Sequence, residues 1–166
     1  MNYTLGHVDP WWDDHYKSFT YQYLPHKDQH MVAEWVRQGY TAGTLNGAVC
    51  DVREHPFAER FFKLFDWSNA GAALYQMNTG DFLPVHRDHY ITYKRVFDIT
   101  DTSTIWRAIV FMEDWKSGHY FEIDNDPLVS WSAGDYVVWN YDVPHMVGNL
   151  GLEPRYTMQI TGMKNV

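Results

Sequence analysis

The segment Ile105–Trp115 (IWRAIVFMEDW), followed by the turn Lys116-Ser117-Gly118 and by His119–Ile123 (HYFEI), is the clearest structural signal in the chain. Both apolar runs are rich in β-branched and aromatic residues and are bounded by turn-forming residues, which is typical of strands. A β-rich fold is therefore the starting point for the rest of the sequence.

Short strand candidates recur at similar intervals on both sides of this segment, separated by turns rich in Gly, Asp and Asn. They are Ala72–Met77, Leu83–His86, Leu128–Trp131, Tyr136–Asn140, Pro144–Val147 and Arg155–Thr161. Ser132-Ala133-Gly134-Asp135 is predicted to be a hairpin turn. Residues 90–104 are polar and are predicted to be a loop with at most one strand. Such a series predicts a barrel or a two-sheet jelly roll.

The N-terminal part has a different pattern. It is aromatic and irregular as far as Tyr23, and then predicts a helix that begins after Asp28 and ends near Gly39. A second helix is predicted over His55–Trp67, and both helices are expected to pack on one outer face. We expect a single domain, 1–166, in which residues 1–70 support a β-core at 71–163.

Composition narrows the class of protein. The net charge is −8, which argues against non-specific binding to nucleic acid. The single cysteine, Cys50, excludes an internal disulfide and is expected to be a buried filler. Neither a signal peptide nor an apolar run long enough to span a membrane is visible, so a cytoplasmic location is expected.

His86-Arg87-Asp88 and the distant His145 form the strongest chemical pattern. Side chains alternate along a strand, so His86 and Asp88 should share one face while Arg87 and His89 point away. Two imidazoles and one carboxylate match the facial triad that binds non-haem Fe(II). The simpler alternative is that these histidines are hydrogen-bonded residues without a metal.

Arg155 and Thr157 follow His145 and should share a face by the same alternation. We expect their strand to run antiparallel beside the strand of His145. A guanidinium offers a two-pronged donor to a carboxylate, and the threonine hydroxyl adds another donor. These residues suit the far carboxylate of a dicarboxylate co-substrate bound to the metal.

Taken together, Tyr75, His86-Arg87-Asp88, Gly118, Gly134-Asp135, His145 and Arg155-Tyr156-Thr157 resemble the Fe(II)/2-oxoglutarate dioxygenase superfamily over residues 72–163. The resemblance implies a mainly β, double-stranded β-helix fold, with His86, Asp88 and His145 as iron ligands. It also implies that Arg155 and Thr157 bind 2-oxoglutarate, helped by Tyr75 as in prolyl-4-hydroxylase-like members. The 134–155 region is also similar to the aspartyl/asparaginyl β-hydroxylase branch, which usually lacks the carboxylate ligand that Asp88 provides here.

The activity implied by this resemblance uses Fe(II), 2-oxoglutarate and O2. It hydroxylates a primary substrate and releases succinate and CO2. Similarity to prolyl and aspartyl/asparaginyl hydroxylases favours a peptidyl or amino-acid-like substrate, bound at a rim that includes Tyr90, Tyr93, Phe97 and Trp12.

Three further residues are candidates for the site. Arg107 is expected either to contact an anion or to lie outward on an edge strand. Asn149 is expected either to support the metal site or simply to form a turn, and Trp139 either to contact substrate or to belong to the core. Two other functions remain open, a cupin-like metalloprotein that does not use 2-oxoglutarate and a non-catalytic jelly-roll binding module.

Overall fold

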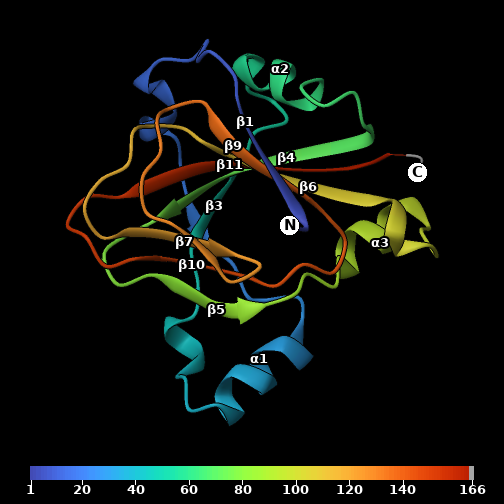
Figure 1. Cartoon of the computed structure of the whole chain (residues 1–166), viewed down its shortest axis with the longest axis vertical. Helices are drawn as coiled ribbons and strands as arrows, with labels where there is room; N and C mark the ends of the chain where they lie inside the picture. Colours follow the sequence, from blue (N-terminus) through green and yellow to red (C-terminus); the bar gives the residue numbers. More distant parts are fainter. Residues whose placement is uncertain (165–166) are drawn as a thin grey trace.

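The computed structural model describes residues 1–164, apart from the side chain of Thr44. Two antiparallel sheets face each other (Figure 1). The larger sheet has the order β1 (Tyr3–His7), β9 (Asp135–Asn140), β6 (Ile105–Phe111), β11 (Arg155–Met163), β4 (Ser68–Met77), β3 (Ala48–Asp51) and β2 (Gln22–Tyr23). The smaller sheet has the order β5 (Phe82–His86), β10 (His145–Asn149), β7 (His119–Ile123) and β8 (Asp126–Leu128). This arrangement confirms the mainly β, double-stranded β-helix class.

Strand β11 lies in the middle of the larger sheet, paired with β4 on one side and β6 on the other. Its even-numbered residues Tyr156, Met158 and Ile160 belong to the apolar core on the outer face of the sheet. Its odd-numbered residues Arg155 and Thr157 point into the space between the sheets. The alternation expected from sequence therefore holds on this strand.

A second apolar cluster fills the closed end of the space between the sheets. It is formed by side chains of β6, β7 and β9 and of the neighbouring loops, namely Ile109, Phe111, Phe121, Ile123, Trp131, Val137, Trp139 and Val143. Trp131 stacks on Phe111 with ring centroids 4.0 Å apart. This packing leaves the other end of the interior free for a cavity.

Of the two predicted helices, the first forms as expected and the second is much shorter than expected. The first is α1 (Gln29–Arg37), where the Asp28 side chain accepts a hydrogen bond from the Met31 amide and Gly39 follows with φ +105°. The second was predicted too long. The chain forms a 3-10 turn, Pro56–Ala58, and then the one-turn helix α2 (Glu59–Phe62). Asp66 adopts a positive φ of 52°, which ends helical geometry before β4 begins.

The helices do not share an outer face as predicted. Figure 1 shows α1 beside β5 and α2 on the far side of the larger sheet. Together with Trp11, Trp12 and the 3-10 helix Asp14–Ser18, α2 covers the apolar outer face of that sheet. Helix α1 instead supports β5, because the Trp35 indole donates a hydrogen bond to the Val85 carbonyl at 3.2 Å.

Residues 90–104 form helices rather than a strand. Helix α3 (Ile91–Phe97) lies between Tyr90 and Asp98, which both have positive φ, and the 3-10 turn Thr102–Thr104 follows. No residue of α3 is buried, so a core-facing periodicity was absent from its sequence. No helix within residues 1–164 has the length and apolar character needed to cross a bilayer.

The turn at Ser132–Asp135 exists, but it is not the hairpin that we predicted. The Asp135 amide donates to the Ser132 carbonyl at 3.0 Å, whereas the strands on either side, β8 and β9, belong to different sheets. The hairpin lies earlier, between β7 and β8, where Asp124 and Asn125 both adopt positive φ. Two such residues fit a tight two-residue turn.

A close contact between two backbone turns fixes the chain between β10 and β11. The Leu150 amide donates to the Gly118 carbonyl at 2.9 Å. A Cβ added to Gly118 would lie 2.2 Å from the Gly151 nitrogen, so the two turns pack together only because Gly118 lacks a side chain. This contact sets the position from which β11 enters the interior with Arg155.

Gly118→Ala should lower the free energy of unfolding more than Gly80→Ala. Both glycines have a positive φ, +89° and +90°, but nothing lies within 4 Å of a Cβ at Gly80. The control should cost about 1–2 kcal/mol from backbone strain alone, and Gly118→Ala a further ~1–3 kcal/mol from overpacking. Equal losses in urea denaturation would contradict a tight contact between the turns.

Candidate metal and co-substrate site

His86 and His145 are brought together by strand register. They are direct cross-strand partners between β5 and β10, and their ring centroids lie 4.3 Å apart. Trp35 of α1 packs edge-on against the His86 ring at 5.4 Å, and Trp139 lies 5.0 Å from the His145 ring. The two imidazoles are therefore held between aromatic side chains.

Each histidine is oriented by its own strand. His86 Nδ1 lies 2.7 Å from the Pro84 carbonyl oxygen, and His145 Nδ1 lies 3.0 Å from the Val143 carbonyl oxygen. A carbonyl only accepts, so each Nδ1 must carry the proton. Each Nε2 is then left with a free lone pair, which is the form that binds a metal.

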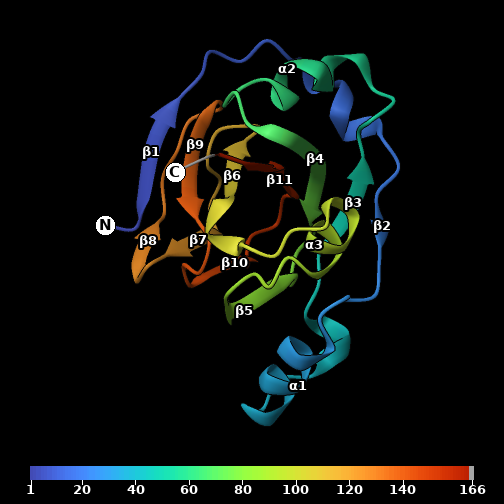
Figure 2. The ribbon, with the colours of Figure 1, turned by 90° about the vertical axis from the view of Figure 1, so that its right-hand side faces the viewer.

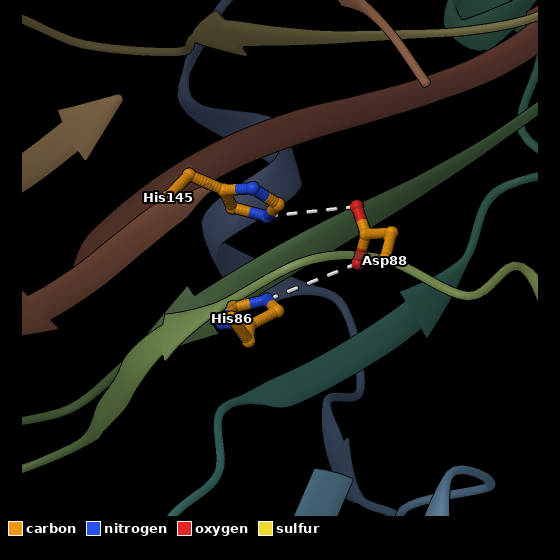
Figure 3. A group of neighbouring side chains, drawn as sticks. All are labelled: His86, Asp88 and His145. Atoms are coloured by element: carbon orange, nitrogen blue, oxygen red, sulfur yellow. Dashed lines mark ion pairs between the residues drawn. The ribbon is translucent and has the colours of Figure 1, made fainter. Parts of the chain in front are cut away.

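Asp88 completes the group (Figure 3). Its Oδ1 lies 3.8 Å from His86 Nε2 and its Oδ2 lies 3.5 Å from His145 Nε2. One ligand atom from each of the three residues lies within 4.8 Å of the others. Arg87 points outward to Asp142, and the exposed His89 pairs with the Asp28 carboxylate, so both point away as predicted, although β5 ends at His86 and neither residue lies on a strand.

The protonation states suit a divalent cation. Burial, followed by the neighbouring His145, lowers the pKa of His86 to about 4. Burial would by itself raise the pKa of Asp88, but Arg107 and the two histidines outweigh it and the pKa is about 2. At neutral pH the group consists of neutral imidazoles and an ionised carboxylate.

These residues fit an Fe(II) ion. Asp88 Oδ2 is buried and accepts no hydrogen bond, and its ion pair with Arg107 Nη1 at 3.0 Å leaves it a lone pair for a cation. The donor set of two imidazole nitrogens and one carboxylate oxygen is that of the non-haem iron triad.

The triad lines a cavity of about 340 Å³ between the two sheets, and Arg155 and Thr157 line the same cavity. The prediction that Arg155 lies on the strand beside that of His145 was wrong. Strand β10 belongs to the smaller sheet and β11 to the larger one, so Arg155 reaches the cavity from the opposite wall. Figure 2 shows these two strands on different sheets.

Arg155 is a buried cation without an ion-pair partner in the described chain. It is 3% exposed, and its Nε and Nη2 atoms have no hydrogen-bond partner. Its guanidinium lies 5.7 Å from the Phe111 ring and 5.5 Å from the Trp131 ring. Burial lowers the pKa of Arg155 to about 9. The cavity thus offers unused donors to an anion.

The neighbours of Arg155 on its own face are polar. Thr157 is paired across strands with Tyr75, so both project to the same side of the sheet. Burial raises the pKa of Tyr75, which keeps its hydroxyl protonated as a donor. Gln159 also lines the cavity and was missed from sequence, although extending the Arg155-x-Thr157 alternation by two residues would have found it.

The three remaining candidates have different surroundings. Arg107 lies on the central strand β6 and forms an ion pair with Asp88, with Nη1 and Oδ2 3.0 Å apart, so the edge-strand alternative was wrong. Trp139 is 1% exposed and belongs to the core, and it also lines the cavity.

Asn149 is fully buried and supports a turn. Its amide nitrogen donates to the Met77 and Glu153 carbonyls, and its Oδ1 accepts from the Gly151 amide at 2.8 Å. Asn149 does not line the cavity, so the structure favours the prediction that it forms a turn over the prediction that it supports the metal site.

Comparison with known proteins supports the fold. No family model matches the chain, and no curated protein matches its sequence significantly. A Pseudomonas putida prolyl-4-hydroxylase has a similar structure, with a TM-score of 0.56, 14% identity, and coverage of 92% of this chain and 96% of that chain. The non-haem α-ketoglutarate-dependent epimerase SnoN from nogalamycin biosynthesis gives a TM-score of 0.53 and 16% identity over 90% and 79%. A cupin protein from Bacteroides fragilis is less similar, with a TM-score of 0.42 and 13% identity over 59% of this chain and 69% of that chain. At these identities the similarities establish the fold alone.

Arg155→Met should stabilise the ligand-free protein. The substitution removes a desolvated, unpaired charge and keeps most of the side-chain volume, so we expect a gain of roughly 1–4 kcal/mol, the range seen when buried ionic groups become apolar. Chemical denaturation without added ligands would measure it. A loss of stability would mean that Arg155 has a structural partner.

Stability of the metal-free protein should fall on acidification below pH 6.5. The pKa of His86 is lowered from 6.5 to about 4 on folding, so the unfolded state binds more protons in this window. The stabilisation is complete above pH 6.5 and is lost as pH falls through about 4. His86→Asn should flatten the profile of unfolding free energy against pH in this window, and an unchanged slope would contradict the assignment.

Proposed function

We propose that this protein is an Fe(II)- and 2-oxoglutarate-dependent oxygenase. His86, Asp88 and His145 would hold the iron, and Arg155 would bind the far carboxylate of 2-oxoglutarate. The observation that carries this proposal is the buried, unpaired guanidinium of Arg155 in the same cavity as a triad of metal-binding groups.

Neither alternative function explains that pairing. A cupin-like metalloprotein that does not use 2-oxoglutarate would need the triad but not a desolvated arginine opposite it. A non-catalytic binding module would need neither. A buried cation is costly unless a partner arrives, and an anionic co-substrate supplies that partner.

Bound Fe(II) would supply the activation of O2 that couples decarboxylation of 2-oxoglutarate, to succinate and CO2, to hydroxylation of a second substrate. The residues around the iron would orient the ligands, supply negative charge, anchor the co-substrate and exclude water. The Pro84 and Val143 carbonyls orient the two imidazoles, and Asp88 contributes the negative charge. Arg155, with Thr157 and Tyr75 beside it, would anchor the co-substrate.

The apolar side chains of the cavity would exclude water from the reacting groups. Ile109, Phe121 and Trp139 belong to the inter-sheet core and also line the cavity. A low-dielectric wall strengthens the ion pair between Arg155 and a carboxylate. We propose a peptidyl or amino-acid-like primary substrate, supported by the similarity in fold to a prolyl-4-hydroxylase.

The visible absorption band of an Fe(II)–2-oxoglutarate chelate provides a test that needs no primary substrate. Anaerobic addition of both to the protein should produce the band, and Asp88→Ala should abolish it. Arg155→Gln should raise the 2-oxoglutarate concentration needed for half-formation, because loss of a charge-assisted pair costs roughly 2–5 kcal/mol.

Arg87→Gln is the matched control, since Arg87 is next to Asp88 in sequence but points outward to Asp142. It should leave the band and the half-formation concentration unchanged. Iron binding without a band in the wild-type protein would favour the cupin-like alternative. Failure to bind iron would favour the binding module.

A further inference from the structure

A second cavity opens next to the first, on the side of Asp88 and Arg107. Its volume is about 540 Å³, and it lies between the small residues Gly71–Ala73 of β4 and the aromatic residues of α3. Asp88 and Arg107 line both cavities, whereas Arg155 lines only the first. With 2-oxoglutarate on the Arg155 side of the first cavity, this groove would be the adjoining space, and it reaches the triad at Asp88.

The β4 side of the groove has unoccupied space at Gly71. Gly71 is the cross-strand partner of Thr161, so a side chain at this position would point to the same side as Thr161, which lines the groove. Nothing lies within 4 Å of a Cβ built on Gly71. The opposite wall carries Tyr93 and Phe97, whose rings lie 4.9 Å apart, and Phe97 is 39% exposed. The groove therefore suits a small molecule with an apolar or aromatic body.

Arg107 is one of the polar residues that line this groove, together with Asp88 and Gln159. Its guanidinium lies 4.7 Å from the Tyr90 ring and 3.0 Å from Asp88, and its buried Nε has no hydrogen-bond partner. The residue is held on a central strand by packing, so its donors are fixed in direction. It retains a donor that neither Asp88 nor any other described residue uses.

The balance of charges around the two cavities indicates the charge of the primary substrate. Arg107 and Arg155 are the cations of the two cavities that are shielded from solvent, and Asp88 is the carboxylate that faces them. Lys27 is exposed and Asp28 pairs with His89, so one buried positive charge remains uncompensated. The doubly charged Fe(II) and the doubly charged 2-oxoglutarate would cancel each other and leave this excess unchanged. Uncompensated charge in a buried site is unfavourable, and one negative charge on the primary substrate would remove it.

We propose that the primary substrate is a small monocarboxylic acid whose carboxylate pairs with Arg107 and whose body lies between β4 and α3. This inference rests on the proposed oxygenase function and narrows its amino-acid-like substrate to a free acid. A residue within a peptide chain has a neutral backbone and, unless its side chain is acidic, would leave Arg107 uncompensated.

The first test compares an acid with its neutral analogue. Protein loaded anaerobically with Fe(II) and 2-oxoglutarate is titrated calorimetrically with 3-phenylpropanoate and with 3-phenylpropanamide. The two probes share one apolar body and differ in charge. We expect the acid to bind at least about tenfold more tightly, equivalent to ~1.4 kcal/mol. Equal affinities, tighter binding of the amide, or no binding of either probe would overturn the inference.

Substitutions at Arg107 and at Gly71 locate the binding, with Arg87→Gln as the control. Arg107→Gln should remove the preference for the acid, while Arg107→Lys should retain part of it and Arg87→Gln all of it. Because Arg107 also contacts Asp88, Gly71→Val provides a test remote from the triad. It should narrow the groove at its β4 side and weaken 3-phenylpropanoate binding about tenfold, while the absorption band with 2-oxoglutarate stays intact. Unchanged acid binding in Gly71→Val would place the probe elsewhere and overturn the inference.

The absorption band and the acid–amide comparison separate an error in the oxygenase function from an error in the substrate class. If no band forms with Fe(II) and 2-oxoglutarate in the wild-type protein, the oxygenase function itself is wrong. If the band forms but the acid is not preferred over the amide, only the monocarboxylate inference is wrong.

Discussion

The two-residue alternation of β11 is the constraint on which the rest of the structure depends. One face of this strand contributes Tyr156, Met158 and Ile160 to the apolar layer that attaches the N-terminal segment and α2. The other face presents Arg155 and Thr157 to the interior. A slip of one residue would bury the wrong set on both sides, so the register that stabilises the fold also fixes the polar wall of the cavity.

The interior contains charged side chains whose burial would each destabilise the fold if no opposite charge lay nearby. Asp88 is buried but lies among Arg107 and two histidines, which keep it ionised. Within residues 1–164 Arg155 has no ion-pair partner, and its guanidinium lies against the Phe111 and Trp131 rings. The ligand-free protein therefore stores an unfavourable charge at the place where a dicarboxylate would bind, and we expect ligand binding to stabilise the fold by mass action.

Sequence reasoning reached the local features of this site and missed the long-range ones. The pattern Arg155-x-Thr157 follows from strand alternation, which is a property of neighbouring residues. Asp88 has the orientation predicted from His86-x-Asp88, although it lies just beyond the end of β5. Which sheet β11 joins depends on contacts with β4 and β6, so the position of Arg155 on the wall opposite His145 was not predictable. The pairing of Arg107 with Asp88 was not predictable for the same reason. Helix α3 was missed because its exposed residues show no core-facing period.

The local hydrogen bonds of the two histidines have a consequence for how the protein can diversify. Each imidazole is aligned by a carbonyl two residues earlier in its own chain segment, at Pro84 and at Val143. No side chain of the groove between β4 and α3 takes part in that alignment. Apart from Asp88 and Arg107, whose charges act on both imidazoles, the lining of the groove can therefore be exchanged, by evolution or by a protein engineer, to accept molecules of another shape without changing the histidine hydrogen bonds.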